Sequence, residues 1–129
     1  YKDSHLEKLI EGNFSLETIS PDNSIIVALG SRSSSGNIWG INTKSKQANR
    51  ITFLPNLYRE VKFSDNETIY YLVSDELITG SINSNNFRKV AEDIDYYWLD
   101  SHYDFIPVLK EKDTYFVSKE NDNIKPVAN

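Results

Sequence analysis

The feature that most constrains the fold is a polar turn followed by a short apolar run, which occurs twice at a long interval. Asp22-Asn23 precedes the apolar run at residues 25–29, and Asp65-Asn66 precedes a comparable run 43 residues later. From Phe14 onward, apolar residues alternate with polar ones, and Asn, Asp, Ser or Gly interrupts the pattern every few residues. Such alternation with frequent turn residues is typical of short antiparallel strands. We therefore predict an all-β chain.

The predicted strands form three antiparallel meanders of four strands, at about residues 14–52, 58–91 and 96–127. Units of about 40 residues with four strands each are typical of the blades of a β-propeller. The turn of the third unit is degenerate, and there we expect Phe105 to take the place that Ile69 has in the second unit. We interpret the three units as propeller-blade-like repeats.

The segment before the first strand has a different pattern. Apolar residues in 3–12 are spaced as on one face of a helix, between residues that suit helix caps. We predict a short N-terminal helix within a lead-in of residues 1–13, followed by a single β domain at residues 14–129. Because the chain contains no methionine, we expect it to be an excerpt or a processed product.

Three blades raise a problem of closure. Propellers typically close with about 4–8 blades, and an unclosed set would leave sheet edges exposed. Three solutions remain open from the sequence. The chain is part of a longer ring, or two chains associate as a homodimer to complete one, or the strands form a small closed β-barrel or sandwich instead.

Composition narrows the function classes. The chain of 129 residues has a net charge of −5 and a pI near 5.0, with the negative charge spread along it, which argues against nucleic acid as a partner. Cysteine is absent, so no disulfide and no thiolate metal site is expected. No apolar run approaches 18 residues, so we predict no membrane segment within this chain.

A family resemblance rests on four short motifs in the first unit. Ser20-Pro21-Asp22-Asn23, Ser31-Arg32, residues 36–39 and Arg50-Ile51-Thr52 together resemble a blade of the TolB-type propellers. In that family the turn is Ser-Pro-Asp-Gly, and Asn23 stands here in place of the glycine. Asn tolerates the positive φ that such a turn needs. The resemblance covers about 33 residues well and implies a bacterial, periplasmic or otherwise extracytoplasmic setting.

Few residues form a pattern typical of a catalytic, metal-binding or ligand-binding site. Asp100, His102 and Asp104 alternate, but we interpret them as a polar turn rather than a metal or proton-relay site. Tyr96 and Trp98 share one face of a predicted strand, and we expect that face to be core, with a binding surface as the alternative. We predict no catalytic residues, no cofactor and no metal.

These observations favour a non-enzymatic extracytoplasmic interaction module that binds a protein partner, or a small ligand, through a propeller-like face. A first alternative is the ligand-sensing domain of a membrane-anchored bacterial regulator, and a second is a propeller fragment appended to a hydrolase. Tyr and Trp are favoured anchors at interfaces. The predicted binding residues are Trp39, Tyr58, Tyr70, Tyr97 and Trp98.

Overall fold

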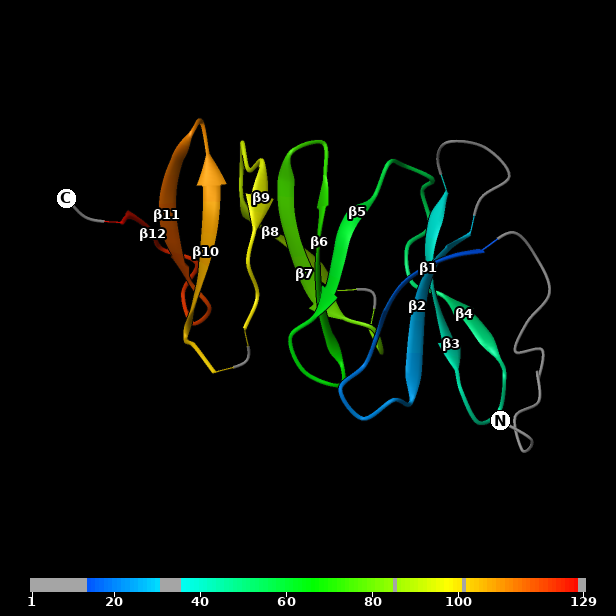
Figure 1. Ribbon diagram of the computed structural model, residues 1–129. Helices are drawn as coiled ribbons and strands as arrows, with labels where there is room; N and C mark the ends of the chain where they lie inside the picture. The colour runs from blue at the N-terminus through cyan, green and yellow to red at the C-terminus, as the bar shows by residue number, and fades with distance from the viewer. Residues whose placement is uncertain (1–13, 31–35, 85, 101, 128–129) are drawn as a thin grey trace, which may run out of the picture.

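A computed structural model of the chain describes residues 14–30, 36–84, 86–100 and 102–127. In these residues the chain is all β and forms three separate antiparallel sheets of four strands, which follow one another in chain order (Figure 1). The prediction of an all-β chain with three four-stranded meanders is therefore confirmed, and the described strands form neither a barrel nor a two-sheet sandwich. The predicted helix at residues 3–12 lies outside the described residues.

Each sheet is a simple meander in which consecutive strands pair. The first sheet contains β1 (Phe14–Ile19), β2 (Ile25–Gly30), β3 (Asn37–Asn42) and β4 (Ala48–Arg50). The second contains β5 (Arg59–Phe63), β6 (Thr68–Val73), β7 (Glu76–Ser81) and β8 (Phe87–Ala91). The third contains β9 (Tyr96–Tyr97), β10 (Phe105–Lys110), β11 (Asp113–Ser118) and β12 (Ile124–Pro126).

The turn between β1 and β2 forms for local reasons. Asn23 has φ of 64°, the positive value expected at this position. Ser20 is buried, and its Oγ accepts hydrogen bonds from the backbone N–H groups of Ser24 at 3.1 Å and Ile25 at 3.0 Å. The same hydroxyl donates to Oδ1 of Asp22 at 2.8 Å. These bonds satisfy the backbone where the chain reverses between two strands.

The corresponding turn between β5 and β6 uses different residues for the same purpose. It has no proline, and Oδ1 of Asp65 accepts hydrogen bonds from the backbone N–H groups of Glu67 and Thr68, both at 2.8 Å. An Asp side chain that bonds to the backbone two residues ahead is a common way to stabilise a turn. The two predicted turn motifs therefore serve equivalent positions in consecutive sheets.

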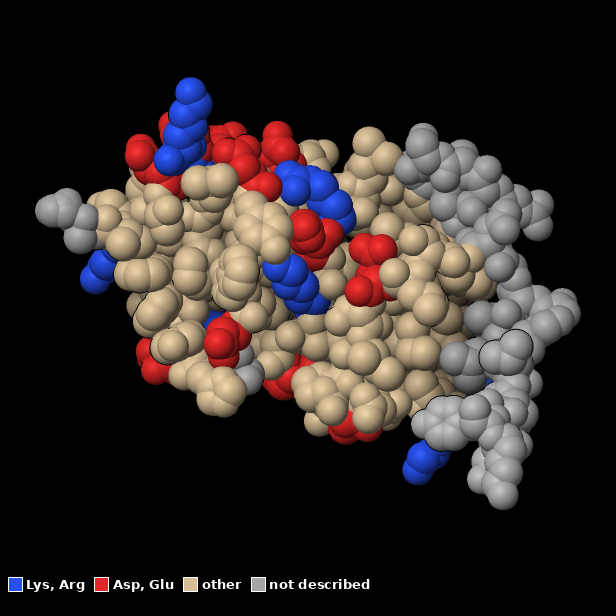
Figure 2. Space-filling view, viewed as in Figure 1, with Lys and Arg blue, Asp and Glu red and all other residues tan. Residues whose placement is uncertain are grey.

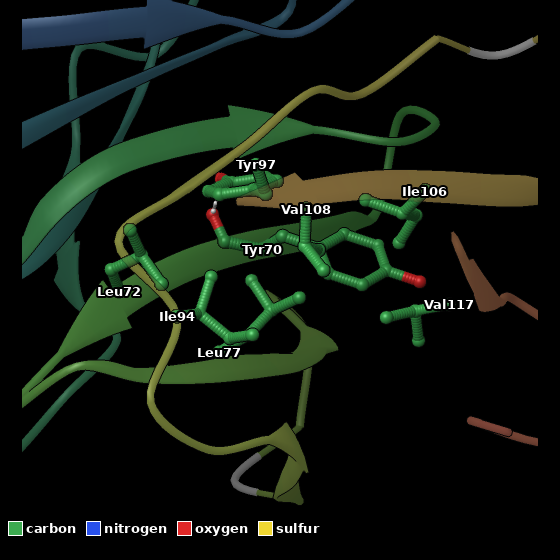
Figure 3. Packing of buried hydrophobic residues seen from close by; sticks show 8 residues of the cluster. All are labelled: Tyr70, Leu72, Leu77, Ile94, Tyr97, Ile106, Val108 and Val117. Atoms are coloured by element: carbon green, nitrogen blue, oxygen red, sulfur yellow. Dashed lines mark hydrogen bonds between the residues drawn. The ribbon is translucent and has the colours of Figure 1, made fainter. Parts of the chain in front are cut away.

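The sheets pack face to face through two apolar layers. Burial of these side chains is the main source of stability, since it removes apolar surface from water. The layer between the first and second sheets contains Val27, Ile38, Ile51, Val61, Ile69 and Tyr71. The layer between the second and third sheets contains Tyr70, Leu72, Leu77, Ile94, Tyr97, Ile106, Val108 and Val117 (Figure 3).

A polar contact joins the second and third sheets inside this second layer. The hydroxyl of Tyr97 lies 3.0 Å from the carbonyl oxygen of Tyr70 and also reaches the carbonyl oxygen of Glu60 (Figure 3). Burial raises the pKa of the Tyr97 phenol, so the hydroxyl stays protonated and can donate. Tyr97 therefore fastens the third sheet to two strands of the second.

One expectation from the sequence, about the strand register of the third unit, is wrong. Phe105 does not take the place of Ile69, because Ile106 is the residue that faces the preceding sheet, as Ile69 does. Phe105 points to the opposite face of its sheet. Since side chains alternate along a strand, an error of one residue in register exchanges the two faces.

Because the sheets pack face to face, the question of how a propeller would close concerns the faces of the first and last sheets as well as their edge strands. The first and last sheets each have one broad face without a sheet against it among the described residues, but that face of the first sheet is not open throughout, since Ala28 and Ile41 on it are 0% and 1% exposed. Among the same residues, no helix has the length and apolar character needed to cross a membrane.

Candidate functional site

The five predicted binding residues are not brought together. Tyr70 is 5% exposed and Tyr97 is 1% exposed, and both belong to the layer between the second and third sheets. A binding role for these two side chains would require that layer to open. The remaining three, Trp39, Tyr58 and Trp98, lie on or near the surface of three different parts of the chain.

Trp39 lies on the outward face of the first sheet, the face away from the second sheet. We call this the N-terminal face and define it by Phe14, Leu16, Ile19, Ile26 and Trp39. The ring of Trp39 is half-buried and meets that of Phe14 edge to face, with centroids 5.9 Å apart. Gly30 lies beneath both rings, and a Cβ at that position would approach Nε1 of Trp39 to 2.7 Å. Leu16 and Ile19 remain 69% and 45% exposed.

Tyr58 has a structural role in the connection between the first two sheets. Its ring packs edge to face on Tyr71, with centroids 5.3 Å apart, and burial raises the pKa of Tyr71 to about 12. The hydroxyl of Tyr58 donates to the carbonyl oxygen of Leu54 at 2.5 Å. Tyr58 therefore links the core to the residues just before it.

Those residues form an exposed apolar loop, which we call the 53–57 loop. It runs from β4 to β5 at the top of Figure 1. The side chains of Phe53, Leu54 and Leu57 are 52%, 77% and 61% exposed. Two backbone hydrogen bonds between Asn56 and Gly36, at 2.9 and 3.1 Å, hold the loop against the start of β3. The loop thus presents large apolar side chains on a fixed backbone.

The binding candidates predicted from the sequence did not include this loop. The available signal was an apolar Phe-Leu beside Pro55, in a connection between strands where polar residues are the rule. Because the predicted binding residues were all aromatic, they included Tyr58, which holds the loop, but not Leu54 and Leu57, which the loop exposes. Arg50 stacks on the ring of Phe53, 4.8 Å from its centroid, and covers part of this surface with a cation.

Trp98 lies on the outward face of the third sheet and is 62% exposed. We call this the C-terminal face and define it by Tyr96, Trp98, Phe105, Pro107, Leu109 and Phe116. Alternation along β9 is as predicted, because Tyr96 and Trp98 share a face and Tyr97 has the other. The expectation that Tyr96 and Trp98 form the core face is wrong, since Tyr97 is the buried residue.

The predicted polar turn around His102 is present. Asp100 accepts hydrogen bonds at Oδ1 from the backbone N–H of His102 at 2.8 Å, and its carboxylate lies 2.9 Å from Nδ1 of the His102 ring. The backbone hydrogen bond from His102 holds the pKa of Asp100 below its usual range, and the His102 side chain lowers it further. Both residues serve the local turn, which agrees with the interpretation from the sequence.

Two carboxylates lie near each other where β1 adjoins β5. Burial raises the pKa of Glu17, and the negative charge of Glu60 raises it further. On the same strand as Glu60, Lys62 reaches the third sheet, where its Nζ lies 4.5 Å from the ring centroids of both Tyr96 and Tyr97. β5 therefore carries both acidic and basic side chains. Among the residues that the structure describes, no three or more His, Cys, Asp and Glu side chains gather as a metal site would require.

No protein-family model matches the sequence, and none of the curated proteins matches it. Solved structures do match in fold. A protein of Agrobacterium tumefaciens assigned as TolB aligns with a TM-score of 0.73 and 11% identity, over 93% of this chain and 51% of its own. The oligogalacturonate lyase of Vibrio parahaemolyticus aligns with a TM-score of 0.71 and 10% identity, over 93% of this chain and 42% of its own.

A third match is the N-terminal domain of Nup159, with a TM-score of 0.67 and 10% identity, over 99% of this chain and 34% of its own. The chain therefore spans about half or less of the length of these structures. At such low identity the likeness concerns the fold, and one of the matched proteins is an enzyme, so fold alone does not assign a function. The structure of this chain is that of three consecutive propeller-blade-like repeats, similar in fold to the TolB-assigned protein.

Proposed function

We propose that this chain is a non-enzymatic protein-interaction module that binds its partner through the 53–57 loop, at one end of the propeller-like fold. The observation that carries the proposal is the exposure of Phe53, Leu54 and Leu57 on a backbone that is held in place. An exposed apolar group is unfavourable in water, and a cluster of them is typical of a surface that another protein covers.

The way the loop is held supports recognition. The hydrogen bonds between Asn56 and Gly36, and from Tyr58 to Leu54, order the backbone before any partner arrives. Binding then costs less conformational entropy than it would for a loop that folds on contact. The exposed side chains are aliphatic and aromatic, so the complementary partner is a protein with an apolar groove rather than a charged polymer.

The setting of this module is part of the proposal. Resemblance to TolB-type propellers, in the turn motif and in the fold, favours a place outside the cytoplasm. The net charge of −5 suits a protein partner better than nucleic acid.

The test places a photo-crosslinking amino acid at Leu54, and separately at Asn83, in cells that produce the protein. Asn83 is an exposed turn residue of the second sheet and serves as the control. We expect one protein adduct at position 54 that is missing at position 83. Absence of any protein adduct specific to position 54 would contradict the proposed function.

A second measurement uses the partner found in this way. Leu54→Asp and Leu57→Asp should each weaken its binding at least tenfold, because a carboxylate would enter an apolar groove. Tyr58→Phe should weaken it less, since the loop loses one hydrogen bond but keeps its apolar side chains. Asn83→Asp, which adds the same charge elsewhere, should leave the affinity unchanged.

A further inference from the structure

We infer that the protein that receives the 53–57 loop carries basic side chains beside its apolar groove, and that these lie against acidic turns at the same end of the second and third sheets. The inference rests on the proposed function, because it names the chemistry of the partner that this loop binds. The surface consists of loops at the ends of strands, so a further sheet packed on the face of the first or the third sheet would not cover it.

Arg59 connects the 53–57 loop with these acidic turns. It follows the loop by two residues and begins β5. Its Nη2 lies 3.3 Å from Oδ1 of Asp75, in the turn between β6 and β7, and its Nη1 donates to the carbonyl oxygen of Asp95, just before β9, at 3.2 Å. The loop, the turn of the second sheet and the start of the third sheet therefore lie side by side.

Acidic side chains dominate this end of the second and third sheets. The connections from β6 to β7, from β8 to β9 and from β10 to β11 all lie here, because neighbouring strands are antiparallel. Residues 74–76, 92–95 and 110–113, which form these connections and the strand ends beside them, contain seven acidic and two basic side chains. Figure 2 shows acidic side chains gathered at the upper left, with cationic ones among them.

Most of these carboxylates have no cation of this chain beside them. Three of the seven form ion pairs, Asp75 with Arg59, and Glu76 and Glu92 with Lys89. Among the described residues, the other four are exposed and form no ion pair: Asp93, Asp95, Glu111 and Asp113. A partner that supplies cations here gains electrostatic attraction, which raises the association rate and fixes its orientation.

The opposite side of the 53–57 loop has the opposite charge. Arg50 ends β4, and its guanidinium covers part of the Phe53 ring. Residues 14–57 contain four basic and two acidic side chains, a net charge of +2, whereas residues 92–127 contain four basic and nine acidic ones, a net charge of −5. Negative charge is therefore concentrated in the third sheet rather than spread evenly along the chain. A partner seated on the loop should turn its basic side toward the third sheet.

The acidic turns are held in place as firmly as the loop. Val73 pairs with Glu76 and Lys110 pairs with Asp113, so two of the connections are tight turns of two residues between paired strand ends. A surface with its backbone already ordered costs little conformational entropy on binding. An apolar centre with a polar and charged rim is the usual arrangement of a protein interface. The same carboxylates disfavour an anionic lipid surface, which would repel them.

The first test adds Asp95 as a third position to the crosslinking experiment at Leu54 and Asn83. Asp95 is exposed and lies beside Arg59, at the acidic end of the third sheet. We expect the protein adduct found at position 54 to form at position 95 as well, and to be missing at position 83. Mass spectrometry of the adduct at position 95 should locate the crosslink in a segment of the partner that contains Lys or Arg.

The second test measures binding of that partner to a variant with both Asp93→Asn and Asp95→Asn. Asn tolerates the φ of 58° at position 93, so the turn should persist. We expect the association rate to fall about threefold to tenfold at low salt, and the difference to vanish near about 0.5 M salt. Asp104→Asn is the matched control, an exposed carboxylate at the other end of β10, and should leave the rate unchanged.

Circular dichroism checks that the double variant is folded, and Glu111→Gln replaces it if it is not. Native association at low salt, or faster association, would overturn the inference. So would an adduct at position 54 without one at position 95, and both results leave the proposed function standing. If position 54 gives no protein adduct, the proposed function and the inference fail together. In sedimentation with phosphatidylglycerol vesicles the protein should stay in the supernatant, and binding that Leu54→Asp abolishes would assign the loop to a membrane instead.

Discussion

The backbone N–H of Asp22 donates a hydrogen bond to Oδ1 of Asn66, at 2.9 Å, across the boundary between the first and second sheets. These residues belong to the two turns whose similarity first indicated a repeat. The turn of one sheet therefore contacts the corresponding turn of the next sheet. Each of these turns therefore shapes its own hairpin and also joins the first sheet to the second.

Replacing Asn66 with Ala tests this contact. The variant removes the acceptor for Asp22 but leaves the Asp65 hydrogen bonds that form the turn, so we expect a loss of about 0.5–1 kcal/mol in the free energy of unfolding. The value lies at the low end because the contact is exposed to water. Urea denaturation measures it, and Asn83→Ala, in another exposed turn, should stay within about 0.5 kcal/mol of the native protein. Equal effects at both positions would contradict the role of the contact.

Tyr97→Phe tests the buried link between the second and third sheets. The change keeps the ring but leaves the carbonyl groups of Glu60 and Tyr70 without this donor in a buried layer. We expect a loss of about 1–3 kcal/mol in the free energy of unfolding. Tyr103→Phe removes a hydroxyl from a ring that is 53% exposed and should have little effect. Chemical denaturation of both variants gives the comparison, and similar stabilities would refute this account.

Two strand glycines should respond differently to the same change. A Cβ at Gly80 would lie 2.6 Å from the carbonyl oxygen of Asn86 and equally close to the ring of Phe87. A Cβ at Gly40 would lie 3.3 Å from the end of the Ile51 side chain, which can shift. We expect Gly80→Ala to lower the free energy of unfolding by about 1–3 kcal/mol, and Gly40→Ala to cost clearly less. Thermal unfolding of both variants measures which substitution destabilises the protein more. A larger loss for Gly40→Ala than for Gly80→Ala would contradict the steric role of the close contacts at Gly80.

Glu17→Gln should stabilise the protein at neutral pH. Burial and the nearby charge of Glu60 raise the pKa of Glu17 in the folded state, so folding favours its protonated form. The native protein therefore loses some stability as pH rises through the unfolded and folded pKa values of this carboxyl, whereas the Gln variant does not. The gain should be small, because the group is largely exposed and salt screens it. It should be present at pH 7 and vanish below the unfolded pKa, near about 4.3.

A denaturation series across this pH range, repeated at high salt, measures the effect. Glu120→Gln is a control at an exposed carboxylate of the third sheet. A stabilisation by Glu17→Gln that persists unchanged at acidic pH would contradict an electrostatic origin.

Local patterns in the sequence determined the strands and the turns. Alternating apolar residues between Asn, Asp, Ser and Gly specify short strands, and the position of Asn23 specifies positive φ, because these properties depend on residues close together in the chain. The grouping into three four-stranded units followed from the spacing of those turns.

Tertiary structure alone decided which face of the third sheet is inside. Alternation in β9 separates Tyr97 from Tyr96 and Trp98, but both sets are aromatic, so the pattern gives two faces without ranking them. The packing of Ile106 and Val108 on the second sheet selects the Tyr97 face. The exposure of Leu54 and Leu57 has the same origin. Whether an apolar side chain is buried depends on what folds over it, and that contact comes from residues distant in the sequence.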